Sequence, residues 1–373
     1  MRRIIVFILV ILLFSFNVSA EETAEDFYKE QYEISGADKL DGALPEDVQK
    51  YMEDYGIDPS DSNWVNNIAS TNVFQHIWEF IRTGAKKPLA GGGAILAIIL
   101  VSASVASFDI KGSAAAAALY ATALSASAII AAPVFSVITA GVNAMKGSAV
   151  FMTSFVPVFA VIVAASGGAV TSISMSSLLL GAVQAVNFIT SFGIMPLMGG
   201  YMAISLSSSV SPIISKTGIA EGIKKLSFWI MSLVTTVFVG ILSIQTAVNG
   251  AADTVTLRTV KFIVGSSVPV AGTALSEALT TVTASMGLLK ASVGIYGVVA
   301  IGLIFLPLIA ELLVWRLVLI LNTCVSELFS LGKISGLLRS VDTVMSVLIG
   351  LLLLTGAMFI ISLTVVVTMG KTS

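Results

Sequence analysis

The sequence predicts an all-α polytopic membrane protein with about seven or eight apolar segments. Apolar residues make up 56% of its 373 residues and charged residues only 11%, whereas about a quarter of an ordinary soluble domain is charged. Beyond Pro88 the chain falls largely into apolar stretches of about 20 residues or more, the length that spans a bilayer as a helix. Many of these stretches are rich in Gly, Ala, Ser and Thr, which let helices approach closely in lipid.

Residues 1–20 have the parts of a secretory signal peptide. Arg2-Arg3 precede the apolar run 4–16, and the small residues Val18-Ser19-Ala20 come directly before the acidic pair Glu21-Glu22. A basic start, a short apolar core and small residues at the cleavage point define such a signal. The alternative is an uncleaved first anchor. Either interpretation places the next region outside the cytoplasm.

Residues 21–85 form an acidic region that we expect to be helical and extracytoplasmic. Between Glu21 and Asp61 there are fourteen acidic residues and three lysines, whereas the rest of the chain after Asp61 has eight acidic and fifteen basic residues. Pro45 and Glu46-Asp47 mark a helix start. After this start, apolar side chains recur at i, i+3, i+4 and i+7, which indicates one buried stripe; they are Val48, Tyr51, Met52 and Tyr55.

Gly56 and the turn at Asp58-Pro59 end this helix, and a second helix is expected over roughly 72–83. Trp64 and Trp78 have the amphipathic rings that are enriched at membrane surfaces. Two interpretations follow. The region is either a small helical cap on the bilayer or a docking surface for a basic partner outside the cytoplasm.

Residues 86–373 are expected to form one compact transmembrane bundle. Several apolar segments are interrupted or bounded by prolines, and broken backbone is tolerated at membrane depth only where it packs in protein or lines a wet cavity. The predicted segments are 89–107, 114–142, 148–170, 176–209, 227–249, 262–286, 291–315 and 341–368.

An internal repeat is predicted within the bundle. Val156-Pro157-Val158 returns as Val268-Pro269-Val270 after 112 residues, and Met195-Pro196-Leu197 returns as Leu306-Pro307-Leu308 after 111. The units cover about 114–215 and 227–327, and the final helix 341–368 follows them. We interpret Pro157, Pro196, Pro269 and Pro307 as broken-helix elements.

The orientation of the two units depends on how many spans each contains. Three spans per unit would invert one copy relative to the other, as in many transporters with a midplane site, and this arrangement is favoured. If the Val-Pro-Val segments only enter the membrane and return to the same side, each unit has two spans and the copies are parallel. The loop lysines are spread over both faces of a simple alternating arrangement and do not decide the question.

Three charged residues within the apolar segments are candidate conduit or packing residues: Glu277, Glu311 and Arg316. A charge at the centre of a bilayer costs roughly 2.5 kcal/mol or more and usually faces the bundle interior or a cavity. The functional interpretation is a polar, protonatable lining of a conduit. The structural alternative pairs Glu311 with Arg316 near an interface and lets Glu277 cap a broken helix.

The sequence contains no recognisable catalytic, cofactor or metal motif. There is one histidine, His76, and one cysteine, Cys324, which excludes an internal disulfide framework and the usual Cys/His metal clusters. No phosphate-binding loop is present, and Gly91-Gly92-Gly93 indicates close helix packing instead. Basic residues do not cluster with aromatic residues as in nucleic-acid binding. We therefore expect a non-enzymatic protein without cofactors, in which transport would need a gradient or a partner ATPase.

The chain resembles the stage III sporulation protein AE family of endospore-forming bacteria over nearly its whole length. The resemblance rests on the signal peptide, residues 31–40, the Leu44-Pro45 and Gly56-Ile57-Asp58-Pro59 elements, and the two Val-Pro-Val elements. It implies a membrane subunit of the complex that links mother cell and forespore. The expected location is the mother-cell membrane around the forespore, with a secretion-type ATPase and ring-forming subunits as partners. No site residues are implied.

The leading functional hypothesis is a channel- or permease-like subunit of this sporulation transport complex. One alternative is a membrane scaffold that assembles the complex without forming a conduit. Another is an independent secondary transporter.

Overall fold

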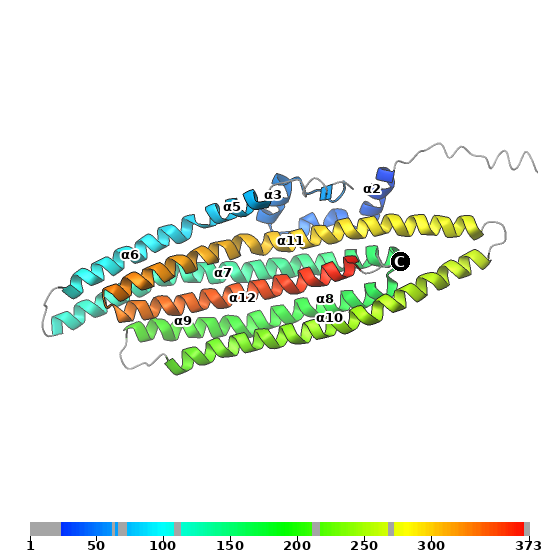
Figure 1. Cartoon of the computed structure of the whole chain (residues 1–373). Coiled ribbons are helices and arrows are strands. Elements are labelled where there is room, and N and C mark those ends of the chain that lie inside the picture. Colours follow the sequence, from blue (N-terminus) through cyan, green and yellow to red (C-terminus); the bar gives the residue numbers. More distant parts are fainter. Residues whose placement is uncertain are drawn as a thin grey trace, which may run out of the picture.

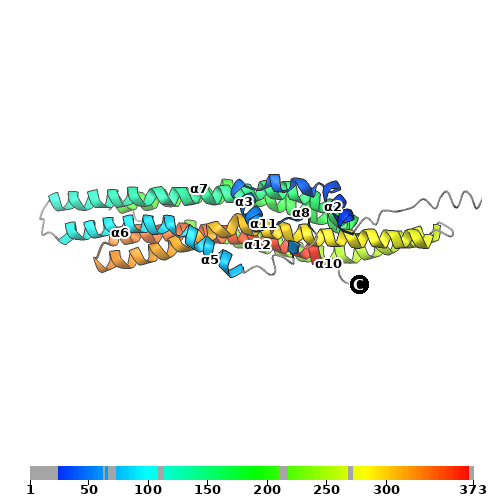
Figure 2. The ribbon, with the colours of Figure 1, turned by 90° about the horizontal axis from the view of Figure 1, so that it is seen from above.

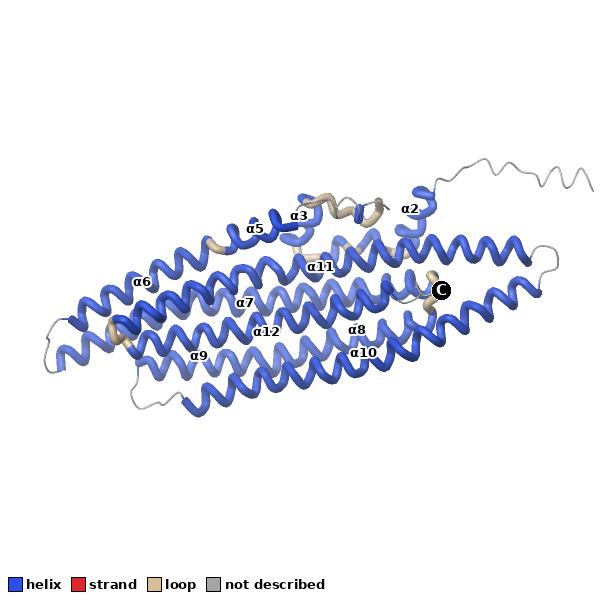
Figure 3. The backbone as a smooth tube through the Cα atoms, viewed as in Figure 1, coloured by secondary structure: helices blue, strands red, loops and turns tan. Residues whose placement is uncertain are grey.

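The structure, a computed structural model, describes residues 24–61, 64–65, 73–107, 113–210, 217–267 and 272–368. The predicted signal peptide lies outside them. The described residues form helices and connecting turns without a strand (Figure 3), which confirms the all-α class. They build an elongated bundle of long helices with a small helical head on one side (Figure 1).

Six helices are long and apolar enough to cross a membrane within the described part of the chain, compared with the seven or eight predicted segments. They are the stretches Glu79–Ser107, Tyr120–Ala165, Ala169–Ser208, Gly222–Val260, Val282–Leu328 and Gly332–Thr368. The helices that contain them are α6 (Lys86–Ser107), α7 (Ser113–Ala165), α8 (Ala169–Phe188) with the π-helical segment η3 (Ile189–Ile194) and α9 (Met195–Val210), α10 (Thr217–Ser267), α11 (Gly272–Leu328) and α12 (Gly332–Thr368).

The count is lower because predicted segments merge into longer helices. The expected segments 114–142 and 148–170 belong mostly to α7, whose 53 residues give a length of about 80 Å at a rise of 1.5 Å per residue. Lys146 is exposed on the surface of α7 and does not end it. Pro133 and Pro157 lie inside α7 and Pro307 inside α11. A proline removes one hydrogen bond of the helix, and these long helices continue on both sides of it.

The head, described over residues 24–61 and 64–65, contains α2 (Ala24–Ile34), the 3₁₀ turns η1 (Ala37–Lys39) and η2 (Asp41–Ala43), and α3 (Glu46–Asp54). Pro45 and the acidic first turn begin α3, and Gly56 follows it with a φ of 63°, a left-handed conformation that suits glycine. The tyrosines of the predicted stripe pack on α5 (Val73–Gly84), with Tyr51 edge-to-face against Phe80 at 5.2 Å between ring centroids.

The head lies along the side of the bundle, against α7 and α11, rather than as a separate cap. Its apolar residues Leu40, Leu44 and Trp64 are buried. Trp64 Nε1 donates a hydrogen bond of 2.6 Å to Ser292 Oγ of α11, and the Tyr296 hydroxyl of α11 donates one to the Asp41 carboxylate. The head and the bundle therefore share one apolar core.

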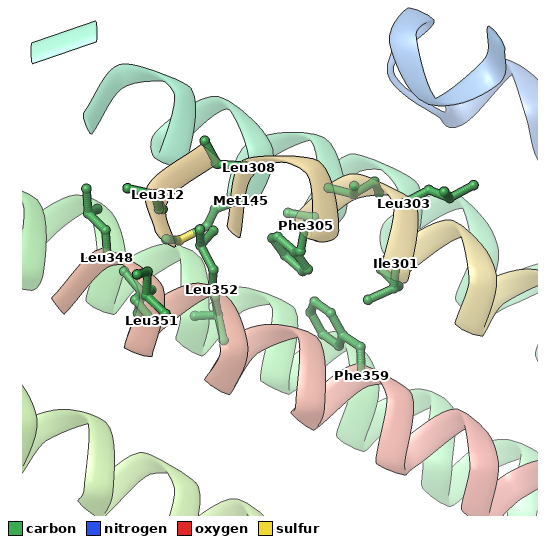
Figure 4. Packing of buried hydrophobic residues seen from close by; sticks show 14 of the residues in the cluster. Met145, Ile301, Leu303, Phe305, Leu308, Leu312, Leu348, Leu351, Leu352 and Phe359 are labelled. Atoms are coloured by element: carbon green, nitrogen blue, oxygen red, sulfur yellow. The ribbon is translucent and has the colours of Figure 1, made fainter. Parts of the chain in front are cut away.

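Apolar side chains fill the centre of the bundle between α7, α11 and α12 (Figure 4). Glycines bring these helices close together. A Cβ at Gly297 would lie 2.6 Å from Phe155 Cζ of α7 and 3.1 Å from Leu363 Cδ1 of α12. The packed residues in the close view include Met145, Ile301, Leu303, Phe305, Leu308, Leu312, Leu348, Leu351, Leu352 and Phe359.

The two predicted repeat units correspond in sequence to a hairpin of α7 with α8–α9 and a hairpin of α10 with α11. Both first helices, α7 and α10, run in the same direction as α12 (Figure 1). The inverted arrangement favoured from the sequence is therefore not the one observed, because each unit contains two long helices instead of three spans. The sequence repeat itself stays a prediction, since Pro269 lies outside the described residues and Pro157 lies inside a helix.

Candidate functional site

A groove on the face of the bundle that carries the head is lined by several polar side chains, including the predicted site residue Glu311. The main cavity of this groove, about 500 Å³, lies between α3, α5, α6, α7 and α11. Polar side chains from all five helices reach it, and the apolar wall includes Pro307 and Leu308. The polar lining residues are Asp47, Tyr51, Thr83, Lys87, Asn143 and Glu311.

A second cavity, about 350 Å³, continues the groove between α6, α7 and α11. The two cavities share Lys87 and Glu311. The continuation is less polar and is lined by Pro133, Ser136 and Trp315, among others. Glu311 and Lys87 therefore lie at the junction of one groove that follows α6 and α7 away from the head.

Glu311 is held at this junction by the close approach of the end of α5 to α11. A Cβ added at Gly84, the last residue of α5, would lie 3.4 Å from the Glu311 Cα. Glu311 is half-buried and forms no ion pair within 4 Å with a described residue. It follows Pro307 by one helical turn, and both side chains line the same cavity.

The structural alternative pairs Arg316 with Glu311, but the structure shows a different partner for Arg316. Its Nε donates a hydrogen bond of 2.8 Å to Asp342 Oδ1 of α12. Sequence analysis missed Asp342 because it is the second residue of the predicted segment 341–368. The signal that could have revealed it is that this acid is the only charged residue from 340 to 368.

Neither Pro157 nor Pro196 lies at the groove, and Pro269 and the side chain of Glu277 lie outside the described residues. The backbone of Glu277 is part of α11, and its side chain is not among those that the structure describes. Pro157 lies inside α7, eight residues before its last residue, Ala165, and Pro196 is the second residue of α9. Neither of these prolines lines the groove cavities. Of the predicted site residues whose side chains the structure describes, only Glu311 and Pro307 share a cavity.

A second polar contact that sequence analysis missed joins α10 to the start of α8. Asp253 Oδ1 accepts a hydrogen bond of 2.8 Å from the backbone N–H of Val170, and Asp253 Oδ2 accepts one of 3.2 Å from that of Thr171. A carboxylate at a helix N-terminus satisfies free backbone donors and interacts favourably with the helix dipole. Leu257, one turn further along α10, packs on Gly167 in the corner before α8.

These features define a polytopic α-helical integral membrane protein with a groove along one face that is lined by apolar residues and by charged groups of both signs. Among the described residues, no group of three or more His, Cys, Asp or Glu side chains is placed to hold a metal ion. The family described as Stage III sporulation protein AE matches residues 65–370, and the chain belongs to this family.

A curated relative, Stage III sporulation protein AE of Bacillus subtilis (strain 168), is 29% identical over 224 residues. The match covers 59% of this chain and 55% of the relative, so the chain spans about half the length of the curated relative that it matches. No solved structure matches the chain.

Proposed function

We propose that this chain is a non-enzymatic, channel- or permease-like membrane subunit of a sporulation transport complex between mother cell and forespore. Family membership and six apolar helices support a membrane subunit of a sporulation complex. The observation that supports a transport role is the groove in which Glu311, Lys87 and Asp47 line one cavity of about 500 Å³.

The route in this proposal follows the groove and not the centre of the bundle. Leu312, Leu348 and Leu352 are fully buried in the centre, and close packing of this kind has few voids larger than a water molecule. The groove, by contrast, has charged groups of both signs at its junction.

The proposal includes a location and partners. The chain would reside in the mother-cell membrane around the forespore, with the head on the extracytoplasmic side after export by the signal peptide. Its partners would be other membrane proteins of the complex, including a secretion-type ATPase that supplies energy and ring-forming subunits. The lipid bilayer surrounds the bundle, and neither a nucleic acid nor a cofactor takes part.

Charge-neutral substitution of the two acids of α11 tests the transport role. We expect Glu311→Gln, alone and with Glu277→Gln, to lower spore yield after engulfment while the amount of protein in the membrane is unchanged. Glu327→Gln is the matched control, because Glu327 is on the same helix but is exposed and paired with Arg339. Full spore yield in the double variant would remove both acids from the mechanism.

A scaffold is the second candidate, and the filled centre of the bundle favours it. Deleting the head would not test this function cleanly, because Leu40 and Trp64 belong to the shared core. Reversing exposed charges is the better test. If Glu33→Lys with Glu53→Lys abolishes recovery of partner subunits while Glu311→Gln has no effect on spore yield, the scaffold replaces the conduit.

A further inference from the structure

The groove contains two opposite charges that do not pair with each other. Lys87 of α6 and Glu311 of α11 line both of its cavities, and neither forms an ion pair within 4 Å with a described residue. Gly84 approaches the backbone of Glu311, and Lys87 follows Gly84 by three residues, so it lies on the same helix face. An ammonium and a carboxylate that share a cavity without contact can each bind the opposite charge of one ligand.

The main cavity offers hydrogen-bond acceptors to such a ligand. Two carboxylates, Asp47 and Glu311, line it. Pro307 has no N–H to donate to the carbonyl oxygen of Leu303, four residues earlier in α11, and both of these residues also line the cavity. A backbone carbonyl that lacks its helical donor needs another one. The main cavity therefore suits a cationic group with several N–H donors.

The second cavity contributes a buried donor. Trp315 is only 3% exposed, and its Nε1 has no hydrogen-bond partner among the described residues. Such a buried polar atom calls for a partner that is not part of the chain. Besides Lys87 and Glu311, the polar side chains in this lining are Ser136 and Trp315. Lys87, Ser136 and Trp315 can all donate a hydrogen bond, so they suit an anionic group.

The charged junction of the groove lies at one end of an apolar span. No charged residue occurs in 88–107 of α6, a stretch of 20 residues that is about 30 Å long, enough to cross the hydrocarbon core. Seen from above (Figure 2), α6 runs between α7 and α11 away from α3. Lys87 is therefore at the end of this span nearer the head, where α3 contributes Asp47 and Tyr51 to the main cavity.

We propose that the groove binds a small zwitterion, a free α-amino acid with an apolar side chain, with its ammonium group at Glu311 and its carboxylate at Lys87. The Leu303 carbonyl accepts a second hydrogen bond from the ammonium group, and the Trp315 N–H donates one to the carboxylate. The main cavity, at about 500 Å³, is of the size usual for small-molecule sites. The inference names the substrate class of the proposed conduit and rests on that proposal only for the role in transport.

The arrangement of charges favours a zwitterion over a simple ion. A ligand with only a positive charge would leave Lys87 unpaired, and a ligand with only a negative charge would leave Glu311 unpaired. A half-buried charge without a partner costs free energy, and like charges brought together in a site disfavour the wrong ligand. The apolar part of the lining, which includes Val137 and Leu308, accommodates the side chain of the amino acid.

Binding of labelled leucine to the purified full chain in phosphatidylcholine nanodiscs tests this site. Leucinol keeps the ammonium group and lacks the carboxylate, whereas N-acetyl-leucine keeps the carboxylate and lacks the ammonium group. We expect each to compete at least about tenfold more weakly than unlabelled leucine, because each loses a hydrogen-bonded charge. Absence of leucine binding, or equal competition by all three compounds, would overturn the proposal.

Substitutions assign the two ends of the ligand. Lys87→Gln should abolish the advantage of leucine over leucinol, and Glu311→Gln should abolish its advantage over N-acetyl-leucine. Trp315→Phe keeps a ring in place and removes the N–H, so it should weaken leucine binding several-fold. Lys86→Gln is the matched control, because Lys86 is exposed and lines neither cavity. Unchanged selectivity in Lys87→Gln and Glu311→Gln, with unfolding temperatures like that of the control, would remove the site.

A phosphatidylethanolamine headgroup carries the same pair of charges, with a phosphate in place of the carboxylate. We expect leucine affinity to be unchanged in nanodiscs that contain this lipid. A fall in affinity as its content rises would assign the groove to lipid and overturn the amino acid.

None of these measurements depends on spore yield. Leucine binding with full spore yield in Glu311→Gln would support the site and remove the conduit. Reduced spore yield without leucine binding would keep the conduit and overturn this substrate class.

Discussion

At the scale of single residues, the Arg316–Asp342 pair is the charged contact whose loss should matter most. The two side chains are 34% and 26% exposed and join α11 to α12. We expect Asp342→Leu to lower stability by about 1–3 kcal/mol, between the values for exposed and fully buried pairs. Thermal unfolding in mild detergent measures the loss, and the Arg316→Asp/Asp342→Arg exchange should recover part of it.

The exposed pair of Glu327 and Arg339 is the control for this prediction. Its side chains are 43% and 69% exposed, and an exposed pair contributes about 0–1 kcal/mol. Glu327→Ala should therefore leave the unfolding temperature nearly unchanged. Equal losses in both variants would contradict the distinction drawn from exposure.

The tyrosines of the head predict a dependence on alkaline pH. Burial raises the pKa of Tyr28 and Tyr32 above that of a free tyrosine, because the charged form loses its hydration. The stability that they contribute is fully present below the unfolded-state pKa of about 10 and falls as the pH rises toward the folded-state pKa. Ultraviolet titration of tyrosinate should show late ionisation, and Tyr32→Phe should reduce the alkaline loss.

At the scale of elements, the glycines of α6 set how closely it packs on α11. An added Cβ at Gly92 would lie 2.1 Å from Val318 Cγ1, whereas nothing lies within 4 Å of one at Gly93. We expect Gly92→Ala to lower the unfolding temperature, because overpacking reduces stability by about 1–3 kcal/mol. Gly93→Ala should be neutral or stabilising, since alanine favours helix. A larger loss of stability in Gly93→Ala than in Gly92→Ala would contradict this packing.

The N-terminus of α8 depends on a residue of another helix. Asp253→Ala leaves the Val170 and Thr171 N–H groups without their acceptor, and loss of such a cap costs about 0.5–2 kcal/mol. We expect faster hydrogen exchange of these two amides together with a lower unfolding temperature. The exposed Arg258 on the same helix provides the control, and Arg258→Ala should change neither.

The sequence predicted helix existence better than helix ends or charge partners. Periodicity located α3 and α5 to within a residue or two, and the close packing expected of the triple glycine holds at Gly92. Apolar patterning alone could not show that α7 continues past Lys146, because an exposed lysine is compatible with a continuing helix. Asp342 and Asp253 were missed because their partners lie 26 and 83 residues away, which local patterns do not report.

At the scale of the whole molecule, a few polar contacts attach the head to the bundle. Ser292→Ala and Tyr296→Phe each remove one hydrogen bond to the head, worth about 0.5–1.5 kcal/mol, or more where an ionised partner is left. We expect faster hydrogen exchange in α3 with little change in α12. Equal acceleration in both helices would indicate that the head does not open separately.

The attachment of the head also determines the order of events during synthesis. Ser292 follows Trp64 by 228 residues, so a ribosome adding roughly 5–20 residues per second makes the two about 10–45 seconds apart. Throughout that interval the apolar side of the head has no α11 to cover it. Maturation of the head is therefore a late event, and nascent chains that stall before Ser292 expose an adhesive surface that chaperones and proteases can recognise.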